Sequence, residues 1–194
     1  DRAERSRWTA HAVKCDPLSP FVRGVAGMCH YITHDYNEAL RLYEEGLAMD
    51  PNSVICLWQS GMTLDRLGRL NEELERFTRA VDLSSRGALM VSFRYRALYR
   101  LGRLAEANAV LDDIRARART EYIAESFWLG PALLNEDEDQ IEAALRLNID
   151  AGTGPTTLSI SVDRELEALL PHPRLGPLVR QLSLYARGPH APQT

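Results

Sequence analysis

The pair His30 and His34 is the part of the sequence that most resembles a metal site. The two imidazoles are four positions apart, one turn along a helix, and Cys29 and Asp35 stand next to them. A closed zinc site takes four ligands, and the sequence holds no other Cys or His near this group. The simpler interpretation is that Cys29 packs as a small hydrophobic residue and His34 lies in a turn between helices. We therefore expect no metal and no cofactor.

Other residue types that carry chemistry do not form a catalytic set. His172 and His190 stand among prolines and glycines, without a nucleophile nearby that would suggest a triad. No glycine-rich phosphate loop occurs. The acidic run "NEDEDQ" at 135–140 suits the positive end of a following helix better than a calcium loop, which needs more spaced oxygen ligands. We expect that the protein is not an enzyme.

Arginines offer a different kind of chemistry, the recognition of carboxylates. Arg96, Arg100 and Arg103 recur at spacings of four and three, so a helix would place them on one face. The guanidinium fork binds carboxylates in a bidentate manner. Such a face predicts an acidic protein or peptide partner.

Bulk composition is that of a soluble globular chain. The 194 residues are 45% hydrophobic and 26% charged, and the net charge of −4 gives no positive field that would attract nucleic acid or a membrane surface. There is no apolar run of membrane-spanning length and no signal-peptide segment at the start. The three cysteines are too few for a disulfide framework, and we expect reduced thiols in a cytoplasmic protein.

The elements that would position these residues recur at a fixed interval. The segment "GRLNEELERF" at Gly68–Phe77 returns as "GRLAEANAVL" at Gly102–Leu111. The dipeptide "DP" at Asp16-Pro17 returns at Asp50-Pro51 after the same interval of 34 residues, which we call the period. Apolar residues follow helical spacing on either side of the turn in each period. This pattern predicts an all-α array of helical hairpins.

The period divides the chain into successive parts. We expect a single solenoid over residues 1–183 and a flexible tail over 184–194. Within the solenoid we expect a half repeat (1–16), three full repeats (20–53, 54–87 and 88–121), a degenerate pair (122–152) and a cap (155–183). The half repeat ends like a second helix but has no first helix, which predicts that the chain was cut from a longer protein. Within the cap, residues 152–162 are expected to be a loop or an extended segment.

The hairpins resemble the tetratricopeptide repeat, a helix–turn–helix unit of about 34 residues with small residues where its two helices cross. The first repeat supplies Ala26-Gly27, Ala39, Tyr43 and Pro51 at the family positions; the second supplies Ser60-Gly61, Phe77 and Ala80; the third supplies Ala107 and Leu111. The resemblance implies a right-handed α-α superhelix.

Three residues depart from the pattern. Glu73 occupies a small position, Ser85 replaces the terminal proline, and Tyr95 stands where glycine is expected. The alternative is an ordinary helical bundle with accidental periodicity, which the three coincident markers disfavour.

The end of the chain resembles the closing cap of a bacterial subgroup of these arrays. The matching residues are Val162-Asp163, Leu166, Leu169, Pro173-Arg174-Leu175 and Leu178. In that subgroup the array commonly follows a protein kinase, a nucleotide cyclase or a winged-helix regulator. The resemblance therefore implies a scaffold in a bacterial signalling protein.

In this family the first helices line a concave groove. Carrying the groove positions over gives Phe21, Met28 and Tyr31; Trp58, Gln59, Met62, Asp65 and Arg66; and Ser92, Arg96, Tyr99 and Arg100. Such a groove is apolar on one side and cationic on the other, which suits an acidic amphipathic or extended peptide. The competing interpretation is that Met28, Trp58 and Met62 are simply core residues.

The leading functional hypothesis is protein–protein interaction, with a peptide or with another domain of the same parent chain. The second hypothesis is an intramolecular scaffold or dimerisation cap, with residues 155–162 filling the groove. A metal protein or an enzyme is a third, weaker hypothesis. Some family members clamp a C-terminal carboxylate with Lys and Asn, but Gly24, Met28, Gln59, Leu89 and Phe93 occupy those positions here. We therefore expect no chaperone-tail binding of that kind.

Overall fold

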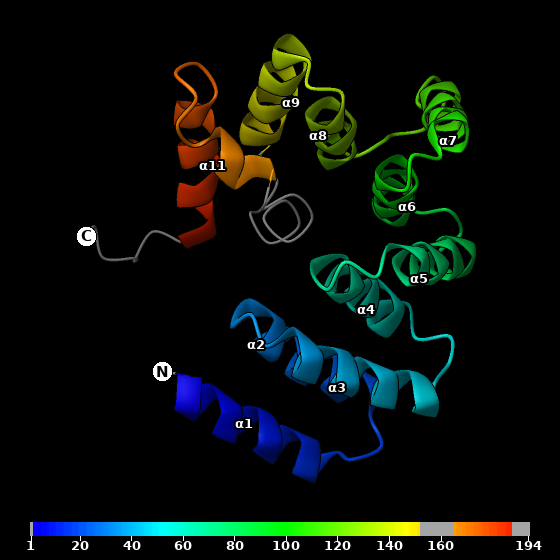
Figure 1. Cartoon of the computed structure of the whole chain (residues 1–194), viewed down its shortest axis with the longest axis vertical. Coiled ribbons are helices and arrows are strands. Elements are labelled where there is room, and N and C mark those ends of the chain that lie inside the picture. Colours follow the sequence, from blue (N-terminus) through cyan, green and yellow to red (C-terminus); the bar gives the residue numbers. More distant parts are fainter. Residues whose placement is uncertain (1, 152–164, 188–194) are drawn as a thin grey trace. The chain divides into compact units, whose positions relative to one another are not determined.

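The computed structural model describes residues 2–151 and 165–187, and the secondary structure in these residues is entirely helical (Figure 1). The prediction of an all-α fold is confirmed. The chain forms two compact units, Asp1–Arg103 and Leu104–Thr194, and each is described by itself. The expected extended segment over 152–162, and most of the tail over 184–194, lie outside the described residues.

The first unit contains six helices among its described residues. They are α1 (Arg2–Cys15), α2 (Pro20–Ile32), α3 (Tyr36–Met49), α4 (Val54–Arg66), α5 (Leu70–Leu83) and α6 (Ala88–Arg100). Each helix packs against the next one in the chain, and α2 also packs against α4. This sequential packing is that of a helical solenoid.

The second unit begins with α7 (Leu104–Arg117), α8 (Glu125–Leu134) and α9 (Glu138–Asp150). A short helical segment over 165–169 and α11 (Gly176–Arg187) follow, where the sequence predicted two short helices. Predicted cap residues Leu166, Leu175 and Leu178 are buried in one core with side chains of α8 and α9. Arg174 forms ion pairs with three carboxylates of α9.

Helix boundaries follow the period of the sequence. The helices α1, α3, α5 and α7 begin one period apart and also end one period apart, and the same holds for α2, α4 and α6. Helix α1 is therefore in register with α3, α5 and α7, which lie where the sequence predicts the second helices of the repeats. Positions one period apart in the first unit can be compared directly.

The turns inside the hairpins share one backbone conformation. His34, Gly68, Gly102 and Glu136 all have positive φ, between 55° and 73°, and each follows the previous one after one period. This left-handed geometry is the usual way to end a helix, and glycine adopts it without strain. His34 lies in the turn, as the sequence predicted.

Replacing Glu136 with glycine is expected to raise the free energy of unfolding of the second unit by about 1 kcal/mol, because a side chain at positive φ costs roughly that much. The converse control is Gly68→Ala in the first unit. A Cβ on Gly68 would meet no atom within 4 Å, so any loss there comes from the backbone alone. Chemical denaturation of both variants measures the two effects, and equal stability of Glu136→Gly and the parent protein would contradict the backbone argument.

Glycine and an aromatic ring fit together where the helices of a hairpin cross. A Cβ on Gly27 would lie 2.3 Å from the Tyr43 ring, and a Cβ on Gly61 would lie 2.6 Å from the Phe77 ring. Both rings are almost fully buried. The rings therefore take the space that a side chain at the glycine would need, as the small-residue pattern predicted.

The three departures from the pattern are accommodated locally. Tyr95 is 1% exposed, and its ring lies 6.1 Å from that of Tyr99. Glu73 is 2% exposed, so the small position of the second hairpin holds a buried carboxyl group. Ser85 and the following Arg86 both have positive φ, so a left-handed turn stands where the first repeat has proline.

A membrane-spanning helix would need a long and strongly apolar segment. None of the helices in the described part of the chain meets that requirement.

Candidate interaction surface

The predicted groove residues lie on α2, α4 and α6, which all belong to the first unit. Helix α2 packs against α4, and two side-chain contacts join α4 to α6. The Trp58 and Phe93 rings are 5.9 Å apart, and Asp65 forms an ion pair with Arg100. The three helices follow one another along the unit (Figure 1).

A row of exposed apolar side chains runs along α2. Leu18 is 79% exposed, Phe21 62%, Ile32 57% and Val25 44%, and Met28 between them is half-buried. Phe21, Val25, Met28 and Ile32 follow one another at spacings of four, three and four positions, which places these four on one face of the helix, while Leu18 lies in the turn just before it. We call this row the α2 stripe. Single exposed apolar residues are ordinary on a protein surface, whereas a contiguous row marks an interaction site.

The predicted residues on α4 are much less accessible. Met62 is 3% exposed and Gln59 is 4% exposed, so both belong to the interior as the structure stands. Trp58 is half-buried. Gln59 Oε1 and Trp58 Nε1 are buried and have no hydrogen-bond partner in the described part of the chain. These two atoms are polar groups in the interior whose hydrogen-bonding capacity the described residues do not use.

The ionic side of the predicted groove is largely occupied by contacts within the protein. The Asp65 and Arg100 side chains are only 15% and 17% exposed around their ion pair. Arg66 Nε donates a hydrogen bond to the Tyr31 hydroxyl at 3.2 Å, and Tyr31 is itself buried. These contacts link α2 to α4 and α4 to α6.

The predicted residues on α6 are also mostly covered. Arg96 is 7% exposed, and its guanidinium carbon lies 6.0 Å from the centre of the Phe93 ring, a cation–π distance. Ser92 is buried, and its hydroxyl donates to the Leu89 carbonyl at 2.8 Å. Tyr99 is half-buried. Arg96 and Ser92 therefore stabilise the helix packing in this structure.

The structure thus brings the predicted residues into one region but gives them unequal access to a partner. Phe21 and Met28 lie on the α2 stripe, while Gln59, Met62, Ser92 and Arg96 lie behind the surface. Val25 and Ile32, which also lie on the stripe, were not among the residues predicted from the sequence. Their spacing relative to Phe21 and Met28 was the signal that could have identified them. Residues 155–162, the expected intramolecular occupant, lie outside the described residues.

The histidines considered as metal ligands have other neighbours. His30 Nδ1 lies 3.4 Å from Asp35 Oδ2, and His34 Nδ1 lies 2.7 Å from the Tyr36 hydroxyl. Within residues 2–151 and 165–187, no group of three or more His, Cys, Asp or Glu side chains is arranged to hold a metal ion.

Comparison with known proteins adds no further identification. No protein-family model matches the chain, and a search of curated proteins found no significant relative. The function is therefore inferred from the geometry of the surface.

Proposed function

We propose that this protein is a non-enzymatic protein-interaction module of the tetratricopeptide type, and that the α2 stripe is its docking surface. The observation that carries the proposal is the exposure of three large apolar residues, Phe21, Val25 and Ile32, on one face of one helix. The periodic register of the helices supports the repeat assignment. A cytoplasmic scaffold is the setting that fits this proposal.

The partner that fits the stripe is an amphipathic α-helix. The spacing of three and four along the stripe is the spacing of a coiled-coil seam, which pairs with a similar row of apolar residues on a second helix. Among the predicted groove residues, three arginines stand against one aspartate, Asp65. This charge balance favours a partner helix that carries acidic residues on its polar side.

The test is selection of binders from a library of amphipathic helical peptides, followed by affinity measurement with a surface variant. Replacing Phe21, Val25 and Ile32 by serine is expected to weaken binding of the selected peptides by about a hundredfold, since each loses a buried apolar contact. The matched control replaces Met49 and Leu83 by serine; these are exposed apolar residues of α3 and α5 that lie outside the stripe. Equal loss in the control, or no loss in the triple variant, would contradict the proposal.

The same assay separates an external partner from the intramolecular alternative. Replacing Leu158, Ile160 and Val162 by serine removes the apolar residues of the segment proposed as an internal occupant. If that segment competes for the stripe, the variant binds the selected peptides more tightly than the parent protein does. Unchanged affinity favours the external partner.

A further inference from the structure

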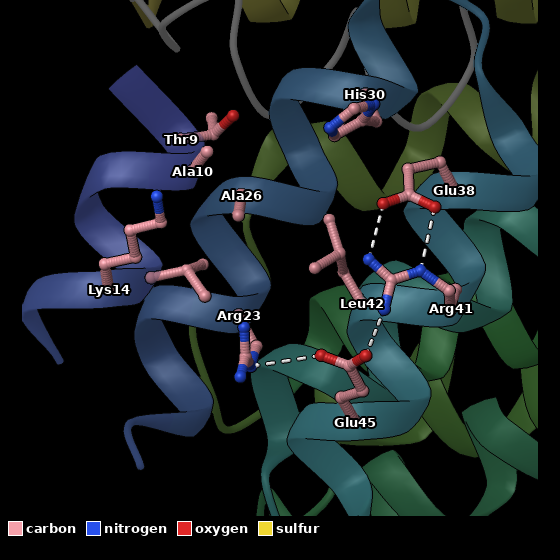
Figure 2. A pocket seen from close by; sticks show the side chains of 11 residues that line it. Thr9, Ala10, Lys14, Arg23, Ala26, His30, Glu38, Arg41, Leu42 and Glu45 are labelled. Carbon is pink, nitrogen blue, oxygen red and sulfur yellow. Dashed lines mark hydrogen bonds and ion pairs between the residues drawn. The ribbon is translucent and has the colours of Figure 1, made fainter. Parts of the chain in front are cut away.

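A cavity of about 450 Å³ lies where α1, α2 and α3 meet (Figure 2). Helical spacing places its α2 residues on the opposite side of that helix from the α2 stripe. Helix α1 contributes Ala10, Val13 and Lys14 to its wall, and α2 contributes Arg23, Ala26 and His30. The α2 residues are three or four positions apart, so they share one helix face. The volume is within the range of pockets that hold small molecules.

The periodic register explains why this interface is open. The next interface along the unit, formed by α3, α4 and α5, holds large residues at the equivalent positions. Tyr43, Leu57 and Leu64 stand one period after Thr9, Arg23 and His30, respectively. All three of these later residues are 0% exposed, so that interface is filled with apolar side chains. The first interface instead has the smaller Thr9 and the polar Arg23 and His30 at these positions, and its space is lined partly by polar groups.

The charges on the α3 side of the cavity form a closed network. Arg41 donates to both oxygens of Glu38, at 2.8 and 2.5 Å, and also to Glu45. The hydrogen bond from Arg41 lowers the pKa of Glu38, so this carboxylate stays ionised at neutral pH. Arg23 Nε lies 3.3 Å from Glu45 Oε2 (Figure 2). Two arginines and two glutamates thereby balance one another.

The cavity wall also holds one cation outside this network and one guanidinium nitrogen whose hydrogen-bonding capacity is not fully used. Lys14 has no ion pair in the part of the chain that the structure describes, and it is exposed at the end of α1. Arg23 Nε is buried without a correctly aligned hydrogen-bond acceptor, although it lies near Glu45. After the balanced network is set aside, Lys14 leaves the cavity with one positive charge. A ligand with a single negative charge would neutralise it, whereas a dianion would leave one uncompensated charge.

We propose that this cavity binds a small organic carboxylate, with its anionic group at Lys14 and Arg23 and its apolar body against Val13, Ala26 and Leu42. The carboxylate accepts charge-assisted hydrogen bonds from the ammonium and guanidinium groups. The apolar side chains cover the remainder of the ligand. This site is independent of the α2 stripe, so its failure would leave the proposed partner surface untouched.

The experiment is a titration of the full chain with hexanoate, followed through the methyl NMR signals of Val13, Ala26 and Leu42. We expect saturable shifts at millimolar concentrations, a range typical of a ligand of this size. Hexanamide, which has the same apolar body without the charge, is expected to bind at least about tenfold more weakly. Hexyl phosphate, as a dianion, is expected to bind no better than hexanoate. Equal binding of hexanoate and hexanamide, or the absence of saturable shifts, would overturn the proposal.

Three variants locate the binding site. Lys14→Met is expected to weaken hexanoate binding about tenfold or more, while Arg7→Met, an exposed arginine of α1 outside the cavity, leaves it unchanged. Ala10→Trp places a large side chain in the cavity from an exposed helix position and is expected to abolish the shifts with little change in melting temperature. Unchanged binding in Lys14→Met or in Ala10→Trp would place the ligand elsewhere and so refute the assignment.

The carboxylate could belong to the C-terminus of a protein chain or to a free small molecule. Titration with a dipeptide distinguishes these two sources. A dipeptide with a free C-terminus and its amidated form are titrated beside hexanoate. Tighter binding of the free-acid dipeptide than of hexanoate, with loss on amidation, identifies the end of a protein chain as the ligand. Tighter binding of hexanoate identifies a free small molecule.

Discussion

Replacing Gly61 with leucine is expected to remove at least about 4 kcal/mol from the stability of the first unit and to abolish its cooperative unfolding. A single Cβ at this position would already lie 2.6 Å from Cε1 of Phe77, closer than real Cβ atoms approach other groups. The Phe77 ring is 1% exposed and stacks on the Phe93 ring at 5.0 Å, so it has no free space to move into. Far-UV circular dichroism during thermal unfolding measures the effect.

Two control variants separate this steric effect from a general intolerance of substitution. Gly87→Ala adds a Cβ that would come no closer than 3.4 Å to a neighbour, so only a small change is expected. The second control combines Gly61→Ala with Phe77→Leu, which makes room at the crossing. This double variant should lose less stability than the sum of its single changes. Additive losses, or a cooperatively folded Gly61→Leu protein, would count against the pairing of α4 with α5.

Replacing Arg96 with glutamate is expected to cost about 3–5 kcal/mol, because it buries a carboxylate where a cation now lies. The side chain is 7% exposed and its guanidinium faces the Phe93 ring. Aromatic faces attract cations and repel anions, so the substitution loses the contact and introduces repulsion. Denaturant unfolding of the full chain gives the change in free energy.

The sequence placed Arg96 among the groove residues that would meet an acidic partner, whereas the structure buries it. The matched control is Arg96→Met, which keeps a long side chain against Phe93 but carries no charge. Its loss of stability is expected to be less than half that of Arg96→Glu, because methionine packs readily on aromatic rings. An Arg96→Glu protein as stable as the parent would mean that this side chain is accessible after all.

The helices could be predicted from sequence because their signals are local and repeated. The spacing between "GRLN" and "GRLA" set the hairpin turns, and Pro51 marked the end of a helix. The close crossing at Gly27 and Gly61 also followed from residue size, but the rings that face these glycines, Tyr43 and Phe77, are known from the structure. The structure confirmed the helices and turns and added the identity of the packing partners.

The candidate sites were harder to predict because exposure depends on which helix covers which face. Met62 on α4 stands one period after Met28 on α2, yet Met62 is buried while Met28 is half-buried. The cavity beside α1 depends on a comparison between equivalent positions, such as Arg23 and Leu57, and that comparison requires the register of the helices. Periodicity alone identifies which residues share a face, but not what packs on it.

The regular placement of the helices also limits how the length of this chain could have changed during evolution. Each residue inserted into or removed from an α-helix rotates everything after it by roughly 100° about the axis. One such change within α3 or α5 would turn the buried row of that helix partly toward solvent. Loss or gain of one full period would instead return every later helix to an equivalent position. Relatives of this protein should therefore differ in length mainly by whole hairpins, with smaller differences confined to the turns.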